Sequence, residues 1–197
     1  MIVIGELING TREAVRKAIS RRDADAIAQL AVRQAEAGAD YLDCNVGVIG
    51  AAEAELMASL VETVSGVVDL PLCIDTANPD AMRAGLDACA DGSRPICNSI
   101  SLEGARLESF LPVIAERQVR VIALLMTDAG VPKGVQERLD AAGRLVAELE
   151  GAGVAREDIL IDAVVTPLSV DPEGPRVAME AMREIGAAIP GAHTICG

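Results

Sequence analysis

Carboxylate and carboxamide side chains recur where the short apolar segments of this sequence end. The segments read YLDCN, CIDTAN, ICNSIS, LLMTD and LIDAVV, and their polar residues are Asp43, Asn45, Asp75, Asn98, Asp128 and Asp162. A carboxylate can accept hydrogen bonds from an amino group and a neighbouring ring N–H, and such charge-assisted bonds are strong. Because no basic residues accompany them, these residues suit a ligand with several N–H donors, such as a pterin or a guanine-like ring, better than an anion.

A second explanation is open for each of these residues taken alone. Asp and Asn also cap helices and stabilise turns, which are the elements that follow strands in an alternating fold. Capping, however, gives no reason for polar residues to recur at strand ends. The recurrence of Asp75, Asn98 and Asp162 therefore favours a shared binding site.

The elements that must position these side chains are apolar runs that alternate with Ala-rich, charged stretches. In the stretches, Asp23 is a plausible N-cap of a helix that Gly38 closes, and Pro79 suits the first turn of another helix. Runs that are apolar throughout and alternate with helices predict a parallel sheet. The predicted strands are Ile2–Ile4, Tyr41–Leu42, Leu70–Ile74, Pro95–Ile96, Val119–Met126, Ile159–Ile161 and Ala192–Ile195.

Seven strands in strict alternation with helices predict an α/β fold of the TIM-type (β/α)8 barrel class. The loops at the carboxyl ends of the strands hold the chemistry in such barrels. No G-x-G-x-x-G follows the first strand, which weakens a dinucleotide-binding alternative. A barrel usually takes about 250 residues, whereas this sequence has 197. We therefore expect one domain over residues 1–197, truncated after the seventh strand. Helix 7 (the barrel helix that follows strand 7), strand 8 and helix 8 would be missing.

Composition excludes several classes of function. The net charge is −13 and only 1% of residues are aromatic, which argues against nucleic-acid binding. No apolar run approaches the roughly 18 residues of a membrane span, and the N-terminus has no basic segment typical of a signal peptide. We expect a cytoplasmic protein without membrane contact.

The cysteines and the single histidine offer two further candidate sites. The five cysteines form no C-x-x-C pair. Strand alternation turns Cys44 and Cys97 away from the face that carries Asp43, Asn45 and Asn98, so buried packing is a better account of them than zinc, and no metal is expected. His193 could act in acid–base chemistry, but a lone histidine at a strand end is more typical of a surface residue.

Several longer motifs resemble one family. In order they are GELING, GADYLDCNVG, LCIDTANPDAMRAGL, ICNSIS, VIALLMTDAGVP, ILIDAVVTPLSVD and HTICG. Together they resemble the methyltetrahydrofolate:corrinoid protein methyltransferases, of the pterin-binding superfamily that also includes dihydropteroate synthase and the folate module of cobalamin-dependent methionine synthase. The resemblance runs from Ile2 to Gly197.

The resemblance implies a barrel that binds methyltetrahydrofolate at its C-terminal mouth. A methyl group would move by nucleophilic displacement between N5 of the pterin and the cobalt of a corrinoid carried by a partner protein, and the enzyme would be a homodimer. The resemblance assigns the pterin ring to Asp75, Asn98 and Asp162. It places further residues near the pocket, namely Asn9, Asp43, Asn45, Met126 and Gly197.

The same resemblance places one important residue beyond this sequence. In the family a Leu-Ser-Asn stretch follows TICG, and its Asn lies close to N5. Because the sequence ends at Gly197, the catalytic residue is unknown, and we expect pterin binding without efficient methyl transfer unless that piece exists elsewhere. The alternatives are a dihydropteroate synthase-like enzyme, which would need a Lys that HTICG lacks, and a non-catalytic truncated pterin-binding domain.

Overall fold

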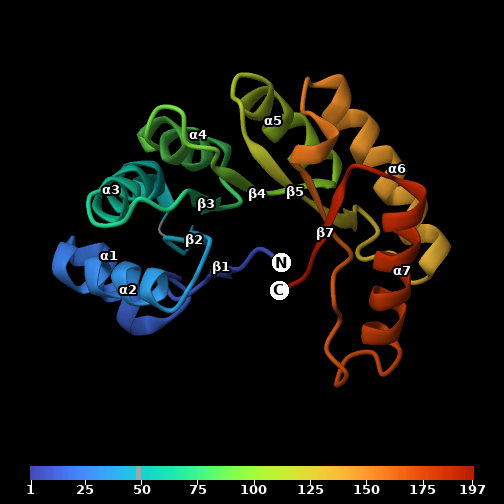
Figure 1. The fold of residues 1–197 in the computed structure, drawn as a ribbon, viewed down its shortest axis with the longest axis horizontal. Helices are drawn as coiled ribbons and strands as arrows, with labels where there is room; N and C mark the ends of the chain where they lie inside the picture. The colour runs from blue at the N-terminus through green and yellow to red at the C-terminus, as the bar shows by residue number, and fades with distance from the viewer. Residues whose placement is uncertain (48–49) are drawn as a thin grey trace. The chain divides into compact units, whose positions relative to one another are not determined.

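A computed structural model describes residues 1–47 and 50–197 (Figure 1). Its strands are β1 (Ile4–Gly5), β2 (Tyr41–Cys44), β3 (Leu72–Asp75), β4 (Ile96–Leu102), β5 (Arg120–Thr127), β6 (Ile159–Asp162) and β7 (His193–Ile195). Its α-helices are α1 (Glu13–Arg21), α2 (Ala24–Glu36), α3 (Glu53–Ser65), α4 (Pro79–Ala88), α5 (Gly104–Ala115), α6 (Val135–Gly151) and α7 (Gly174–Ala188). Short 3₁₀ turns precede α3 and β6, at Gly50–Ala52 and Arg156–Asp158.

The strands form a sheet in which they follow one another in chain order from β1 to β7. The pairings of β1 with β2, β2 with β3, β3 with β4, β5 with β6 and β6 with β7 are all parallel. Parallel neighbours need a crossover connection, which the helices supply. This order and alternation confirm the predicted (β/α)8-barrel class through its seventh strand.

Several elements differ from the predictions. The fourth strand, β4, runs from Ile96 to Leu102, whereas the predicted strand is Pro95–Ile96. The first strand is Ile4–Gly5, whereas Ile2 and Val3 lie outside it and are exposed. A separate helix, α1, precedes the helix that is predicted between Asp23 and Gly38, and α1 buries Val15 and Ile19. Val15 and Ile19 are four residues apart and share one helix face, so this helix could have been found from its spacing.

Contacts between residues divide the chain into two compact units, Met1–Asn98 and Ser99–Gly197. The boundary falls within β4, which contributes Ile96–Asn98 to the first unit and Ser99–Leu102 to the second. Each unit has its own buried core.

In the first unit, α3 and α4 pack together beside β3 (Figure 1). Gly85 of α4 makes this approach possible, since a Cβ there would lie 2.7 Å from Ile74 Cγ2 and 2.8 Å from Met57 Cγ. Ile74 and Met57 are completely buried. The side chain of Ile74 therefore points from β3 toward the helices.

In the second unit, α6 and α7 lie side by side (Figure 1). Leu145 and Leu149 of α6 are completely buried, and Ala178 and Ala181 of α7 are buried with them. Small residues on α7 permit close helix packing. The strands of this unit are covered by apolar helix faces, as a buried parallel sheet requires.

The predicted helix starts are confirmed. The Asp23 side chain accepts a hydrogen bond from the Ala26 N–H over 3.1 Å and so caps α2. Pro79 lies at the start of α4, where Asn78 is the N-cap and accepts from the Asp80 N–H over 3.0 Å. These bonds satisfy N–H groups that have no partner within the helix.

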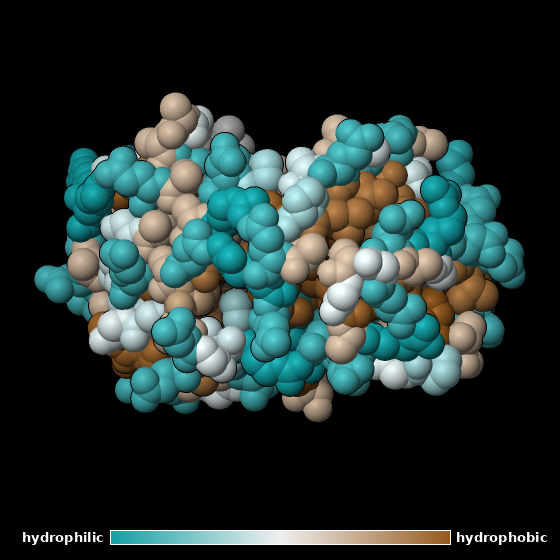
Figure 2. Space-filling model, turned by 90° about the horizontal axis from the view of Figure 1, so that it is seen from above, coloured by the Kyte–Doolittle hydropathy of each residue, from teal (hydrophilic) through white to brown (hydrophobic). Residues whose placement is uncertain are grey.

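The surface carries both charged and apolar residues. On the face drawn in Figure 2, hydrophilic residues surround areas of hydrophobic ones. Among the helices that the structure describes, none is both long and apolar enough to cross a membrane.

Candidate functional site

The first unit gathers polar side chains at the carboxyl ends of its strands. Asp75 of β3 pairs in register with Asn98 of β4. Asn45, just after β2, donates from Nδ2 to Asp75 Oδ2 over 2.7 Å. Asn9 forms an isolated parallel bridge with Asn45. Four of the residues selected from the sequence therefore form a row across this end of the first unit.

The backbone around Asn9 and Asn45 fixes the start of that row. The Gly10 N–H donates to Asn45 O over 2.7 Å, and the Asn45 N–H donates to Ile8 O over 3.1 Å. A Cβ on Gly10 would lie 2.3 Å from Val46 O, so only glycine permits this approach. The glycine that ends GELING thus allows the loop after β1 to lie against the loop after β2.

Asp43 lies one layer below the row, in register with Cys73. It is 2% exposed, and Asn98 Nδ2 donates to its Oδ1 over a long 3.4 Å. Burial, followed by the negative charge of Asp75, raises the pKa of Asp43 to about 7, although hydrogen bonds from Cys73 and Asn98 oppose this rise. A carboxyl group with this pKa can hold or release a proton near neutral pH.

The loop after Asp75 is held by Glu53, which begins α3. Thr76 Oγ1 donates to Glu53 Oε1, and Asn78 Nδ2 donates to Glu53 Oε2 over 3.2 Å. The Thr76 N–H also donates to Asn98 O over 3.1 Å. Asp75 is therefore followed by a loop that is tied both to α3 and to β4. Glu53 could not be selected from the sequence, because nothing in the chain marks a partner so far from Thr76.

The second unit contains Asp162 at the end of β6. Asp162 is half-buried and in register with Leu124 of β5 and Ile195 of β7. Its Oδ1 accepts the Val164 N–H over 2.8 Å. Burial raises the pKa of Asp162, while the Val164 N–H and the charge of Arg138 oppose that rise. Met126 lies two residues beyond Leu124 on β5 and so faces the same side of the sheet as Asp162.

Three other residues considered in the sequence have different surroundings. Asp128 accepts the Gly104 N–H over 3.2 Å at Oδ1, so it binds the N-terminus of α5, the helix before β5, and not that of the helix that follows its own strand. His193 is exposed at the start of β7. Gly197 is exposed and lies after β7. Arg138, which no sequence motif marks, is buried beside the β6–α7 loop.

The cysteines lie where strand alternation predicts. Cys44 and Cys97 are in register with Ile74, which faces the helices, and both are completely buried. Burial raises the pKa of the Cys44 and Cys73 thiols, which disfavours the thiolate that metals bind. Within residues 1–47 and 50–197, no group of three or more His, Cys, Asp or Glu residues is placed to hold a metal ion.

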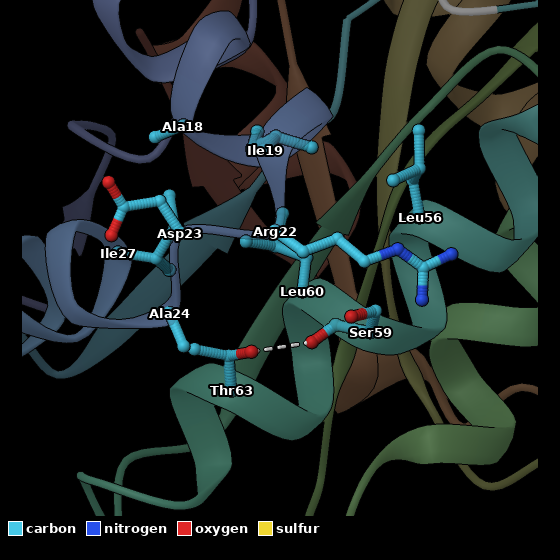
Figure 3. Close-up of a pocket in the computed structure, with 10 residues that line it drawn as sticks. All are labelled: Ala18, Ile19, Arg22, Asp23, Ala24, Ile27, Leu56, Ser59, Leu60 and Thr63. Atoms are coloured by element: carbon cyan, nitrogen blue, oxygen red, sulfur yellow. Dashed lines mark hydrogen bonds between the residues drawn. The ribbon is translucent and has the colours of Figure 1, made fainter.

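A hollow of about 110 Å³ lies among α1, α2 and α3 of the first unit (Figure 3). Three of its polar side chains are already engaged. Asp23 caps α2, Thr63 Oγ1 donates to Ser59 O over 2.8 Å, and Arg22 pairs with Glu55. The rest of the lining is mainly Ala, Ile and Leu. We regard it as imperfect packing between helices rather than as a polar binding site.

Comparison with known proteins identifies the family to which this chain belongs. The sequence pattern of the family described as "Pterin binding enzyme" matches residues 5–197. The chain belongs to this family, which confirms the resemblance to the pterin-binding superfamily.

Two known proteins are similar to this chain in sequence. The chain is 32% identical to the methylcorrinoid:tetrahydrofolate methyltransferase of Eubacterium limosum over 87% of this chain and 63% of that protein. It is also 27% identical to the methionine synthase of Mycobacterium tuberculosis over 100% of this chain and 17% of that protein. The chain thus spans less than two thirds of the length of either relative.

Solved structures show the same fold. The dihydropteroate synthase of Xanthomonas albilineans in complex with 7,8-dihydropteroate matches with a TM-score of 0.67 and 22% identity, covering 98% of this chain and 69% of that one. The same enzyme with 4-aminobenzoic acid matches with a TM-score of 0.68 and 21% identity. At this identity, the likeness shows the fold alone.

Proposed function

We propose that this chain binds the pterin ring of methyltetrahydrofolate in a methyltransferase that moves a methyl group between N5 of the folate and the cobalt of a corrinoid protein. The observation that carries the proposal is the polar row of the first unit, in which Asn45 holds Asp75 and Asn98 lies beside it. The name of the Eubacterium limosum relative supports the choice of reaction.

The donor and acceptor types fit a pterin. Its amino group and ring N–H groups need acceptors, which Asp75 and Asp162 offer, while carboxamides can both donate and accept. We assign Asp75, Asn98 and Asp162 to the ring. Pocket neighbours are the remaining residues chosen from the sequence, Asn9, Asp43, Asn45, Met126 and Gly197.

Proton supply is the second contribution that we assign to these residues. N5 is a poor leaving group until it gains positive charge, so transfer from methyltetrahydrofolate needs a pocket that favours the protonated pterin. Asp43, with a pKa of about 7, is protonated in about half of the molecules at neutral pH, and it contacts Asn98. We infer that Asp43, once it has released its proton, and Asn98 stabilise the positive charge that N5 gains on protonation, before the N5–methyl bond breaks.

The enzyme also needs a partner protein that carries the corrinoid. The corrinoid is the second substrate and is carried by a partner protein, so one surface of this chain must dock that protein. We further propose a homodimer located in the cytoplasm, in which residues 1–197 belong to a single barrel domain.

Dihydropteroate synthase remains the alternative because its structures share the fold. That reaction joins a pterin diphosphate to an aminobenzoate and calls for cationic side chains late in the barrel. Strand β7 here reads HTI and has no lysine. We therefore favour methyl transfer.

Calorimetric titration with methyltetrahydrofolate tests the pterin assignment. Asp75→Ala should weaken binding about 10- to 100-fold, the usual value of a hydrogen bond to a charged group. Asp69→Ala, which removes an exposed carboxylate before β3, is the matched control and should bind as the wild type does. Equal affinity of all three proteins would remove the assignment. Incubation of the wild type with [methyl-¹³C]methyltetrahydrofolate and reduced cobalamin then tests the transfer itself, with 4-aminobenzoate and a pterin diphosphate as the competing assay.

A further inference from the structure

Arg138 of α6 is 2% exposed and is one of the largest buried side chains among the described residues. A buried guanidinium is costly unless its N–H groups are hydrogen-bonded. Its place in the first turn of α6 adds to that cost, because the helix dipole disfavours a cation there. Its neighbours must therefore compensate the charge.

Backbone carbonyl groups supply that compensation. Arg138 Nε donates to Pro132 O over 2.9 Å. Its Nη1 donates to Ala163 O over 2.7 Å and to Val164 O over 3.2 Å. The last two acceptors directly follow Asp162, so Arg138 holds the beginning of the β6–α7 loop.

Val164 has an unusual backbone conformation at this point. Its φ is +59°, in the left-handed region that β-branched residues rarely adopt. Its N–H donates to Asp162 Oδ1 over 2.8 Å, while its carbonyl accepts from Arg138. The strained residue is thus held from both sides, and its N–H fixes the Asp162 carboxylate.

The other end of the loop is anchored separately. The Gly174 N–H donates to Asp171 O over 3.0 Å. A Cβ on Gly174 would lie 2.8 Å from Thr166 Cβ, so the loop also packs closely against the start of α7. The charge of Asp171 acts on Arg138 together with that of Asp162. The hydrogen bonds that Arg138 makes to this loop are to its first part, at Ala163 and Val164.

We propose that Arg138 is a positioning residue for Asp162: by holding the carbonyl oxygens of Ala163 and Val164, it keeps Val164 in its left-handed conformation and so orients the Asp162 carboxylate toward a pterin-like ligand. This inference rests on the proposed function for its ligand, but the positioning itself can be measured without any ligand.

The ligand-free experiment compares the wild type, Arg138→Met and Arg138→Lys by NMR. In Arg138→Met, hydrogen exchange of the Val164 amide should accelerate about tenfold or more, and the pKa of the Asp162 carboxyl should rise because a nearby positive charge is lost. Arg138→Lys should show smaller changes than Arg138→Met in both the exchange of the Val164 amide and the pKa of Asp162. Arg120→Met is the matched control, because Arg120 is a nearly buried arginine of the same unit that pairs with Asp158 over 3.4 Å before β6. This control should leave both signals of the loop unchanged.

The ligand experiment uses methyltetrahydrofolate as its probe. Arg138→Met should weaken binding about tenfold, and Val164→Gly in the same chain should recover most of the loss, since glycine adopts positive φ without strain. Thermal unfolding of each variant separates a change in ligand affinity from a general loss of stability.

Each outcome decides the inference. An unchanged Val164 amide and Asp162 titration in Arg138→Met would overturn the positioning role, as would equal changes in Arg120→Met. If Arg138→Met alters both signals but neither the wild type nor Asp162→Ala binds the folate, the positioning stands and the proposed function fails.

Discussion

Asn45 Nδ2 donates to Asp75 Oδ2 over 2.7 Å and so joins the end of β2 to the end of β3. The orientation of this carboxamide is fixed, because Asn45 Oδ1 accepts the Gly47 N–H over 2.7 Å. The Asp75 carboxylate is therefore held by a donor that cannot rotate away without losing a second bond. Such a side chain is organised before any ligand arrives, which reduces the entropy that binding must overcome.

Two substitutions at Asn45 separate its two bonds. Asn45→Ala removes both and should lower the free energy of unfolding by about 1–3 kcal/mol. Asn45→Asp keeps an acceptor for the Gly47 N–H but places a second carboxylate beside Asp75. It should therefore destabilise more than Asn45→Ala at pH 8 and less at pH 5, where protonation relieves the repulsion. Urea unfolding at the two pH values checks this order, and a pH-independent difference would contradict it.

Asp43 predicts a pH dependence of stability. Its pKa is about 7 in the folded protein and close to 4 in an unfolded chain, so the folded state binds the proton more tightly. Stability should consequently fall as pH rises from about 4 to about 7, by roughly 2–4 kcal/mol. Asp43→Asn should lack this fall. Asp25→Asn, at an exposed carboxylate in α2, should keep the wild-type slope in urea unfolding across this range.

The strands and the polar row of the first unit could be predicted from the sequence because both follow local rules. Apolar runs mark buried strands, and alternation places Asn45 with Asp43 and turns Cys44 away from them. Parallel pairing in chain order then brings Asp75 beside Asn98. That these residues and Asp162 bind one ligand together stays a prediction.

The features that could not be predicted depend on contacts between distant residues. Glu53 meets Thr76, and Arg138 meets Ala163, but each pair is more than twenty positions apart and neither pair belongs to a motif. The raised pKa of Asp43 depends on burial in a fold that must exist first. An Asp that binds a helix N-terminus and an Asp that binds a ligand look alike at a strand end, so the contact of Asp128 with the Gly104 N–H could not be predicted.

Gly85 and Gly143 should respond in opposite directions to the same substitution. Gly85→Ala forces a Cβ against Ile74, a stiff β-branched side chain, and should lower the free energy of unfolding by about 1–3 kcal/mol. A Cβ on Gly143 of α6 meets nothing within 4 Å, so Gly143→Ala should raise the free energy of unfolding by about 0.5–1 kcal/mol. Chemical unfolding measures both. Equal effects would mean that α4 can move away from β3 at little cost.

Glu53 should influence ligand binding without touching the ligand. Glu53→Ala leaves the donors of Thr76 and Asn78 without this acceptor and should cost about 1–3 kcal/mol of stability. Because the loop directly follows Asp75, affinity for methyltetrahydrofolate should also fall, by about tenfold. Glu53→Gln keeps one acceptor oxygen, so it should retain part of the stability and part of the affinity for methyltetrahydrofolate.

Glu55 provides the matched control for this experiment. It lies in the same helix two residues later, but it is exposed and pairs with Arg22 at the surface. An exposed ion pair contributes about 0–1 kcal/mol, so Glu55→Ala should change stability little and leave affinity for the folate unaltered. A loss of affinity shared by Glu53→Ala and Glu55→Ala would trace the effect to α3 as a whole. A loss confined to Glu53→Ala would assign it to the loop that carries Asp75 into the site.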